Sequence, residues 1–302
     1  MTDPLLLADA LGAVRIERWS VTCGGGRLAA ASIGPPQRAA WVLAHGAGSS
    51  ARFLSQAFAA PVLAAGYRLV VYDLRGHGAS ATARRPEDHH LDVHAGDLAA
   101  VVAAVDGDIE VVGGISLGAH AAVRAVAGGL LERAPGPRAV VGCLPAWVGR
   151  SVPGSGAHAL IARRVREVGV VAHRDAAARD PGLAPWLREA LARDLLRHDE
   201  DSLAAALLAL DGAEAPSLEE VAGLTCPLAV LAWQDDPAHP LAVAERWVAA
   251  ADRGLLCRLA LRDLDVEVQR LGSRAVSAVA RLTAPGPVSG PVSGCDDGQR
   301  PV

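Results

Sequence analysis

Gly114-Ile115-Ser116-Leu117-Gly118 is the most informative segment of this chain. It follows the apolar run Ile109–Val112 and precedes the alanine-rich run Ala119–Ala127, so it joins an expected strand to an expected helix. The two glycines permit a strained turn that lifts the serine hydroxyl above the edge of a sheet. Gly-x-Ser-x-Gly alone says little in a chain with 32 glycines, and the turn could simply hold a serine. Its place between a strand and a helix makes Ser116 a candidate nucleophile.

Length and composition predict one large α/β domain, or one such domain with an insertion. The chain has 302 residues, of which 51% are hydrophobic and only 3% aromatic, so we expect an aliphatic core. A net charge of -4 argues against nucleic acid and anionic membranes as partners. No apolar run reaches the roughly 18 residues of a membrane span, and no basic leader opens the chain. We therefore expect a cytoplasmic protein.

The five cysteines are odd in number, scattered, and never at Cys-x-x-Cys spacing. This pattern predicts reduced thiols rather than a disulfide framework or a zinc site. The sequence shows no metal-ligand spacing, phosphate loop or dinucleotide fingerprint. We therefore expect a site that needs no metal and no cofactor and that takes a small-molecule substrate; the oligomeric state stays open.

Strands and helices alternate through the first half of the chain, which is typical of a parallel sheet. An antiparallel pair comes first, joined by the turn Gly24-Gly25-Gly26. The expected strands are Arg15–Val21, Leu28–Ile33, Ala40–Ala44, Arg68–Tyr72, Ile109–Gly113, Ala139–Leu144, Pro227–Trp233 and Leu256–Leu261.

The alternation breaks at residues 145–222, where no strand is evident. Helical patterns occur instead at His158–Val168, Leu183–Arg197 and Ser202–Leu210, and a helical insertion between two strands predicts a cap over the sheet edge. The expected organisation is therefore a first core segment (1–144), a cap (145–222), a second core segment (223–282) and a disordered tail (283–302) with the repeat Gly-Pro-Val-Ser.

Four segments that follow expected strands resemble motifs of the α/β-hydrolase superfamily. They are His45-Gly46-Ala47-Gly48, Asp73-Leu74-Arg75-Gly76-His77-Gly78-Ala79-Ser80, Gly114–Gly118 and Trp233–Pro240. The resemblance spans roughly residues 15–282. It implies an α/β-hydrolase fold: an eight-stranded, mostly parallel sheet flanked by helices, with a helical cap.

The same resemblance implies roles for individual residues. Ser116 would be the nucleophile, and the amides of Ala47 and Leu117 would form the oxyanion hole. Asp236 best matches the acid of the catalytic triad, with Asp235 as the second candidate. The alternative for both aspartates is turn capping before a proline.

Five polar side chains near these motifs are expected to brace the scaffold rather than to react. Bracing of the loops is the more natural role for side chains within the first two motifs, and His120 lies one helical turn beyond Ser116. These residues are His45, Asp73, Arg75, His77 and His120.

The histidine that should complete the triad is absent from its usual place after the last strand. Leu264-Asp265-Val266 stands there, and no histidine follows His239. Asp265, or Asp263, could take the position of the base. A carboxylate with an ordinary pKa near 4 is a poor base for a serine hydroxyl.

Three interpretations of the missing base remain open. His239, three residues after Asp236, could act as the base, or it could be a histidine of the turn. The cap could supply the base through a histidine at position 158, 173 or 198. Alternatively, the site could have no serine relay at all.

These interpretations imply different functions. With a relay, Ser116 would carry out hydrolysis or acyl transfer on an ester, thioester or amide of a small apolar molecule. Trp147 and Trp186 of the cap would then line an apolar pocket. Without a relay, the fold could support cyclisation, elimination or isomerisation, or only ligand binding.

Overall fold

The computed structural model describes residues 14–132, 134–151, 157–236, 238–284 and 292–293, and the side chains at 157, 265, 266, 292 and 293 lie outside that description. A nine-stranded sheet forms the centre, in the order β1-β2-β4-β3-β5-β6-β7-β8-β9. The strands are β1 (Ile16–Cys23), β2 (Gly26–Ile33), β3 (Ala40–Ala44), β4 (Arg68–Tyr72), β5 (Ile109–Ile115), β6 (Ala139–Cys143), β7 (Leu228–Trp233), β8 (Gly254–Leu259) and β9 (Val292–Ser293).

Strand pairing follows the expected pattern. β2 pairs antiparallel with both of its neighbours, β1 and β4. All the remaining neighbours, in the order β4-β3-β5-β6-β7-β8-β9, pair in parallel. In a parallel sheet the strands are covered on both faces and read as continuous apolar runs, as β3, β4 and β7 do. The mostly parallel α/β architecture is thereby confirmed.

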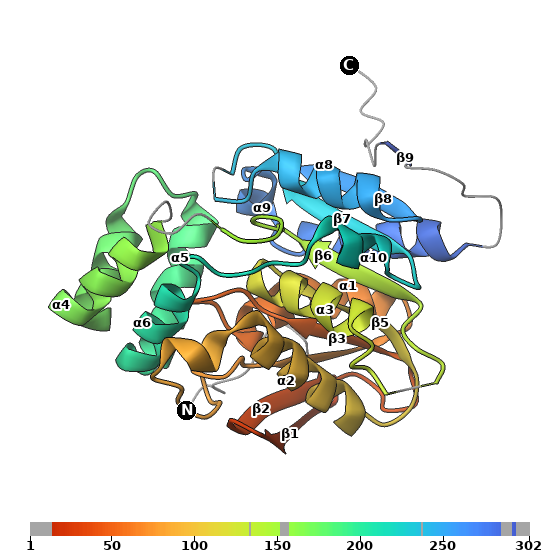
Figure 1. Ribbon diagram of the computed structural model, residues 1–302, viewed down its shortest axis with the longest axis horizontal. Coiled ribbons are helices and arrows are strands. Elements are labelled where there is room, and N and C mark those ends of the chain that lie inside the picture. The colour runs from red at the N-terminus through yellow and green to blue at the C-terminus, as the bar shows by residue number, and fades with distance from the viewer. Residues whose placement is uncertain (1–13, 133, 152–156, 237, 285–291, 294–302) are drawn as a thin grey trace.

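Helices cover both faces of the sheet (Figure 1). Helices α1 and α10 pack together on one face, and α2, α3 and α8 lie on the other. The helices are α1 (Ala51–Ala64), η2 (Pro86–His89), α2 (Leu91–Ala104), α3 (Leu117–Ala127), α4 (Ala157–Arg179), α5 (Pro185–Asp194), η3 (Leu195–Arg197), α6 (Glu200–Ala209), α7 (Leu218–Ala222), α8 (Leu241–Ala250), α9 (Asp263–Val266) and α10 (Arg270–Thr283).

The insertion between β6 and β7 folds as helices, which stand together at one end of the sheet (Figure 1, green). Helix α4 contacts both α5 and α6, whereas α7 returns to the core against α3 and α8. Helix α4 is longer than its sequence pattern predicts, because it continues past a kink at Gly169 (φ 83°) to Arg179. Val170 and Ala177 beyond the kink pack on the small core of the cap, which supports this second half.

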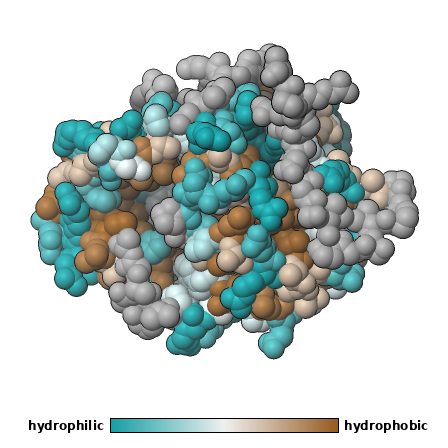
Figure 2. Space-filling model, turned by 90° about the horizontal axis from the view of Figure 1, so that it is seen from above, coloured by the Kyte–Doolittle hydropathy of each residue, from teal (hydrophilic) through white to brown (hydrophobic). Residues whose placement is uncertain are grey.

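The cap also carries the most exposed apolar side chains of the described residues. Leu160, Val168 and Val171 lie on α4 with exposed fractions of 49–66%. Seen from above, hydrophobic side chains lie among hydrophilic ones on that side of the molecule (Figure 2).

The tail predicted to be disordered (283–302) is described at four residues. Thr283 is the last residue of α10 and Ala284 follows it, whereas Val292 and Ser293 form β9 and extend the sheet beyond β8. A sheet edge offers unpaired backbone groups, which such a short strand can satisfy. Residues 285–291 and 294–302 lie outside the described residues. The four described cysteines form no disulfide. Among the helices of the described part, none is long and apolar enough to cross a membrane.

Candidate active site

The turn between β5 and α3 holds Ser116 in a backbone conformation that few residues adopt. Its φ is 52° and its ψ is -116°, and it immediately precedes the first residue of α3. A Cβ atom at Gly114 or Gly118 would overlap the carbonyl oxygen of Ala44, which explains both glycines of the motif. Strain of this kind persists only where the surrounding structure enforces it, and it is common at functional sites.

The loop after β3 lies directly beside this turn. An added Cβ at Gly46 would lie 3.2 Å from the Cβ of Ser116. The first N–H groups of a helix have no partner within the helix, and Leu117 begins α3. Ala47 of the loop lines the same cavity as Ser116, and the amides of Ala47 and Leu117 stay the two candidates for an oxyanion hole.

A continuous chain of hydrogen bonds joins Ser116, His239 and Asp236. The Nε2 atom of His239 lies 3.0 Å from Oγ of Ser116, and its Nδ1 atom lies 2.7 Å from Oδ2 of Asp236. An Nδ1–H that donates to the carboxylate leaves Nε2 as an acceptor for the hydroxyl hydrogen. The arrangement has the connectivity of a Ser-His-Asp triad.

The loop between β7 and α8 provides both the acid and the imidazole. Asp236 and His239 are three residues apart, and the N–H of Ala238 donates to Oδ1 of Asp236 at 2.8 Å, which braces the turn. Burial raises the pKa of Asp236, but the hydrogen bond from His239 and the Ala238 amide outweigh it, so this pKa lies below its ordinary value. The carboxylate is therefore ionised at neutral pH.

The two other described carboxylates proposed from the sequence, Asp235 and Asp263, do not belong to this hydrogen-bond chain, although Asp235 lines the same cavity. Oδ1 of Asp235 accepts a hydrogen bond from the N–H of Leu261 at 3.0 Å, so this carboxylate ties two loops together. Asp263 accepts from the N–H of Ala260 at 2.9 Å and thereby caps a turn. Asp265, the candidate replacement for the histidine, has a side chain outside the described residues. In the loop that follows β8, Leu261 lines the cavity.

The three cap histidines do not share one location. His158 lines the cavity, whereas His173 lies on α4 and does not line it. His198 lies on the opposite side of the oxyanion loop: its Nε2–H donates to the oxygen of Gly48 at 3.2 Å, and its Nδ1 accepts from the N–H of Gly78 at 3.1 Å. A bracing role for His198 was not foreseen, because nothing local in its sequence indicates a contact with residue 48.

The residues expected to brace the scaffold do so. Nε2 of His45 accepts from the Leu74 N–H at 2.9 Å, and Nε2 of His77 accepts from the Gly48 N–H at 3.0 Å. Burial lowers the pKa of His45 to about 4, so its ring is neutral. His77 and His198 thus hold Gly48 from both sides.

Two carboxylates and one further histidine complete the scaffold. Asp73 accepts from the N–H groups of Ala51 and Ala79, each at 2.9 Å. Arg75 forms a buried pair of hydrogen bonds with Asp97 at 2.5 and 2.6 Å. His120 accepts from the N–H of Ala146 at 3.1 Å, and burial lowers its pKa to about 3.

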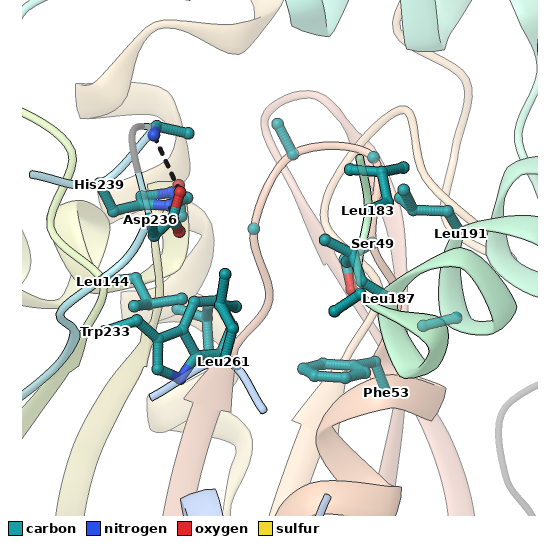
Figure 3. Close-up of a pocket in the computed structure, with 18 of the residues that line it drawn as sticks. Ser49, Phe53, Leu144, Leu183, Leu187, Leu191, Trp233, Asp236, His239 and Leu261 are labelled. Atoms are coloured by element: carbon teal, nitrogen blue, oxygen red, sulfur yellow. Dashed lines mark hydrogen bonds and ion pairs between the residues drawn. The ribbon is translucent and has the colours of Figure 1, made fainter. Parts of the chain in front are cut away.

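Ser116 and His239 open into a cavity of about 420 Å³ between the sheet edge and the cap. Figure 3 shows Asp236, His239 and Trp233 on one side of it, with Phe53 and cap leucines on the other. The wall is largely aliphatic and includes six leucines: Leu144, Leu183, Leu187, Leu191, Leu210 and Leu261. Trp186 lines it as predicted, but Trp147 does not: its ring packs edge-on against His120, 5.2 Å between centroids.

Metal ligands are not grouped anywhere in the described residues: no set of three or more His, Cys, Asp or Glu side chains could hold an ion there. The hydrogen-bonded groups at Ser116 are a hydroxyl, an imidazole and a carboxylate. Such a set suits acyl transfer through a covalent serine ester.

Comparison with known proteins agrees with this architecture. Residues 41–277 match the family model described as the Alpha/beta hydrolase family. No curated protein matches the sequence. Among solved structures, the enol-lactonase from Burkholderia xenovorans LB400 is similar with a TM-score of 0.67 and 20% identity, over 85% of this chain and 99% of that one.

Two further structures differ in their described activities. The bottromycin epimerase in complex with bottromycin A2 has a TM-score of 0.66 and 20% identity, over 87% of this chain and 100% of that one. A carboxylesterase structure from the ammonia-oxidizing thaumarchaeon Nitrososphaera gargenis has a TM-score of 0.70 and 15% identity, over 88% of this chain and 99% of that one. At these identities the likeness concerns the fold.

Proposed function

Because the chain belongs to the alpha/beta hydrolase family, we propose that it is a serine hydrolase in which Ser116, His239 and Asp236 form the catalytic relay. The observation that carries this proposal is the hydrogen-bond chain of 3.0 and 2.7 Å from Oγ of Ser116 through the His239 ring to Asp236. A base must lie within about 2.6–3.2 Å of the proton that it removes, and His239 meets this condition.

The acylation step follows from the geometry. Oγ of Ser116 attacks the carbonyl carbon of the substrate while Nε2 of His239 takes the hydroxyl proton, and Asp236 stabilises the imidazolium. The carbonyl oxygen becomes an oxyanion that accepts hydrogen bonds from the amides of Ala47 and Leu117. When the intermediate collapses, the bond to the leaving group breaks, and His239 gives its proton to that group.

Deacylation repeats these steps with water. His239 removes a proton from a water molecule, which attacks the acyl-Ser116 ester. The second tetrahedral intermediate uses the same two amides, and its collapse releases a carboxylic acid and returns the proton to Oγ of Ser116. Another acyl acceptor in place of water would give acyl transfer.

A base on the β7–α8 loop can replace one after β8 because the relay depends on geometry rather than on sequence position. The chain order Ser116, Asp236, His239 is still serine, acid, histidine, although acid and base now share one turn. Their separation of three residues and the Ala238–Asp236 hydrogen bond hold the imidazole in place without a second loop.

The cavity supports a small, largely apolar substrate. Its volume of about 420 Å³ lies within the range of small-molecule sites, and leucines dominate its wall. Esters, thioesters and amides of such molecules are the substrates that the proposed relay would cleave.

The decisive experiment measures how fast a fluorophosphonate probe labels the protein, followed by mass spectrometry of the modified peptide. We expect the wild type to be labelled at Ser116 and Ser116→Ala not to be labelled. His239→Gln should slow labelling on the order of 10³-fold or more, and Asp236→Asn to a similar degree, since each removes a member of the relay. His173→Gln, a cap histidine outside the cavity, serves as the matched control and should react like the wild type.

Three results would contradict the proposal. Equal labelling rates for His239→Gln and the wild type would show that His239 is not the base. Turnover of a substrate that survives Ser116→Ala would favour the alternative of a cyclisation, elimination or isomerisation on this fold. A folded protein that binds ligands but is never labelled would instead be a binding protein without a working relay.

A further inference from the structure

Aromatic side chains are scarce in this chain, and three of them lie at the candidate active site. The chain has six tryptophans, two tyrosines and two phenylalanines. Three of these, Phe53, Trp186 and Trp233, line the cavity that contains Ser116 and His239. The other seven do not line it, and four of them are fully buried in the core: Trp41, Phe58, Tyr72 and Trp247. The three rings at the cavity differ from those four because they border open space beside the proposed relay, where a ligand can contact them.

The three rings form one connected wall, in which Trp186 links Phe53 on one side of the cavity to Trp233 on the other (Figure 3). Phe53 and Trp186 are stacked with 5.9 Å between their centroids and 24° between their planes. Trp186 and Trp233 meet edge to face at 5.4 Å and 65°. Both arrangements are favourable geometries for aromatic pairs.

Each ring comes from a different part of the fold. Phe53 lies on α1, Trp186 on the cap helix α5, and Trp233 at the end of β7, three residues before Asp236. The wall thus extends from the proposed relay to the cap, and Trp186 is the ring that the cap contributes to it.

The wall is held in a fixed orientation. The indole Nε1–H of Trp186 donates to the carbonyl oxygen of Leu261 at 3.1 Å. Phe53 and Trp233 are only 8% and 5% exposed, so their neighbours restrict their rotamers. Leu261 is in turn tied to the β7 loop through its N–H bond to Asp235.

The rest of the cavity is a mostly apolar slot, although its lining also includes Ser49, His158, Asp194 and Asp235. Figure 3 shows Trp233 and Leu144 on the side of the relay, facing Phe53, Leu183 and Leu187 across the open space. A flat apolar group fits between walls of this kind, with its face or edge toward the rings. Aromatic rings prefer offset-stacked or edge-to-face neighbours, whereas a puckered saturated ring gains only apolar contact.

We propose that this cavity selects substrates that carry an aromatic ring, and that Phe53, Trp186 and Trp233 are the residues that recognise the ring. The proposal rests on the hydrolase function proposed above and names the substrate class of the same site. An aromatic pair is stabilised beyond its buried area by an amount that corresponds to about a tenfold preference over a saturated ring of similar size.

The test uses pairs of esters that differ only in the ring. Methyl phenylacetate is compared with methyl cyclohexylacetate for the acyl side, and benzyl acetate with cyclohexylmethyl acetate for the alcohol side. Hydrolysis is followed by acid release. We expect kcat/KM to favour the aromatic member of at least one pair by about tenfold. Trp186→Leu should reduce that preference to less than about threefold, chiefly through KM, because its role is binding.

Trp147→Leu is the matched control, since it removes a cap tryptophan that does not line the cavity, and it should keep the preference. Thermal unfolding followed by circular dichroism checks that each variant folds. If Trp186→Leu does not fold, Phe53→Leu takes its place. Equal kcat/KM within both pairs, or a preference that survives loss of the ring, would overturn the inference.

A binding measurement separates this inference from the proposed function. Calorimetry on Ser116→Ala compares phenylacetate with cyclohexylacetate and benzyl alcohol with cyclohexylmethanol, so no catalysis is needed. Tighter binding of an aromatic compound without any ester hydrolysis by the wild type would refute the hydrolase and leave the aromatic site standing. Hydrolysis of all four esters with no preference in either assay would leave the hydrolase standing and refute the aromatic site.

Discussion

Asp194 is a carboxylate at the end of an apolar helix face, and its replacement by asparagine should stabilise the protein at neutral pH. It is the last residue of α5, it lines the cavity on the same face as Leu187 and Leu191, and only 4% of its surface is exposed. Burial raises its pKa to about 6, although the Ser50 hydroxyl and the nearby Arg197 oppose this rise. Ionisation of this group therefore works against folding.

The sign and size follow from proton linkage. Because the folded-state pKa of about 6 lies above the ordinary value of 3.8, the unfolded chain loses its proton first as the pH rises. Stability from this group is full at low pH and is lost as the pH rises through the window from 4 to 6. The difference of about two pH units corresponds to about 3 kcal/mol at about pH 8 and about half of that at about pH 5. Asp194→Asn cannot ionise and removes this cost.

The assay is urea-induced unfolding of the wild type and Asp194→Asn at the two pH values. We expect the gain in the free energy of unfolding for the variant to be larger at pH 8 than at pH 5 by about 1.5 kcal/mol. Asp252→Asn, at an exposed turn, is the control and should change stability by less than about 0.5 kcal/mol at both pH values. The comparison within each pH cancels the titration of all other groups. A gain that is absent, or that is the same at both pH values, would refute the argument.

Three further outcomes are expected. Burial lowers the pKa of His45 and of His198 to about 4, so the unfolded chain binds more protons than the folded chain below about pH 6.5. The free energy of unfolding should therefore fall from about pH 6.5 toward about pH 4, by up to about 1.4 kcal/mol per pH unit for each ring. Urea titrations over this pH range measure the slope, which should be shallower for His198→Gln. His198→Ala should lower kcat about tenfold or more with a smaller change in KM, because Gly48 of the oxyanion loop loses its hydrogen bond from His198. Equal effects on kcat and KM would argue for a purely structural role of His198. Gly118→Ala should give little or no folded protein by circular dichroism, since the new Cβ would overlap the carbonyl of Ala44; a folded and labelled variant would show that the turn is looser than described.

Much of the fold follows from local patterns. The apolar runs before residues 45, 73 and 114 predict buried parallel strands, and the glycines of each following motif predict the turns. The turn at Ser116 is the clearest case. Gly114 and Gly118 are both required because a Cβ atom at either position would overlap the carbonyl oxygen of Ala44, at the end of the neighbouring strand β3. The second half of α4 was missed, because it depends on packing against α6 rather than on its own periodicity.

The candidate site can be predicted only in part from the sequence. Ser116 and the oxyanion loop are marked by short motifs, but His239 was one of several candidates for the base. Local spacing shows that it can reach Asp236. It does not show that the β7–α8 loop would bring it within 3.0 Å of a serine 123 residues earlier in the chain. Asp265, which stands where the base is expected, has a side chain outside the described residues.

Local sequence patterns are enough to predict the strand–turn–helix at Ser116, the parallel sheet and a helical insertion, because these depend on backbone preferences and on the periodicity of neighbouring residues. Three contacts become visible only in the folded chain: His239 faces Ser116, His198 holds Gly48, and Trp186 rather than Trp147 lines the cavity. Each of those contacts joins segments far apart in the chain. Their distances are set by how the cap and the loops pack on the sheet, and no spacing along the sequence encodes them.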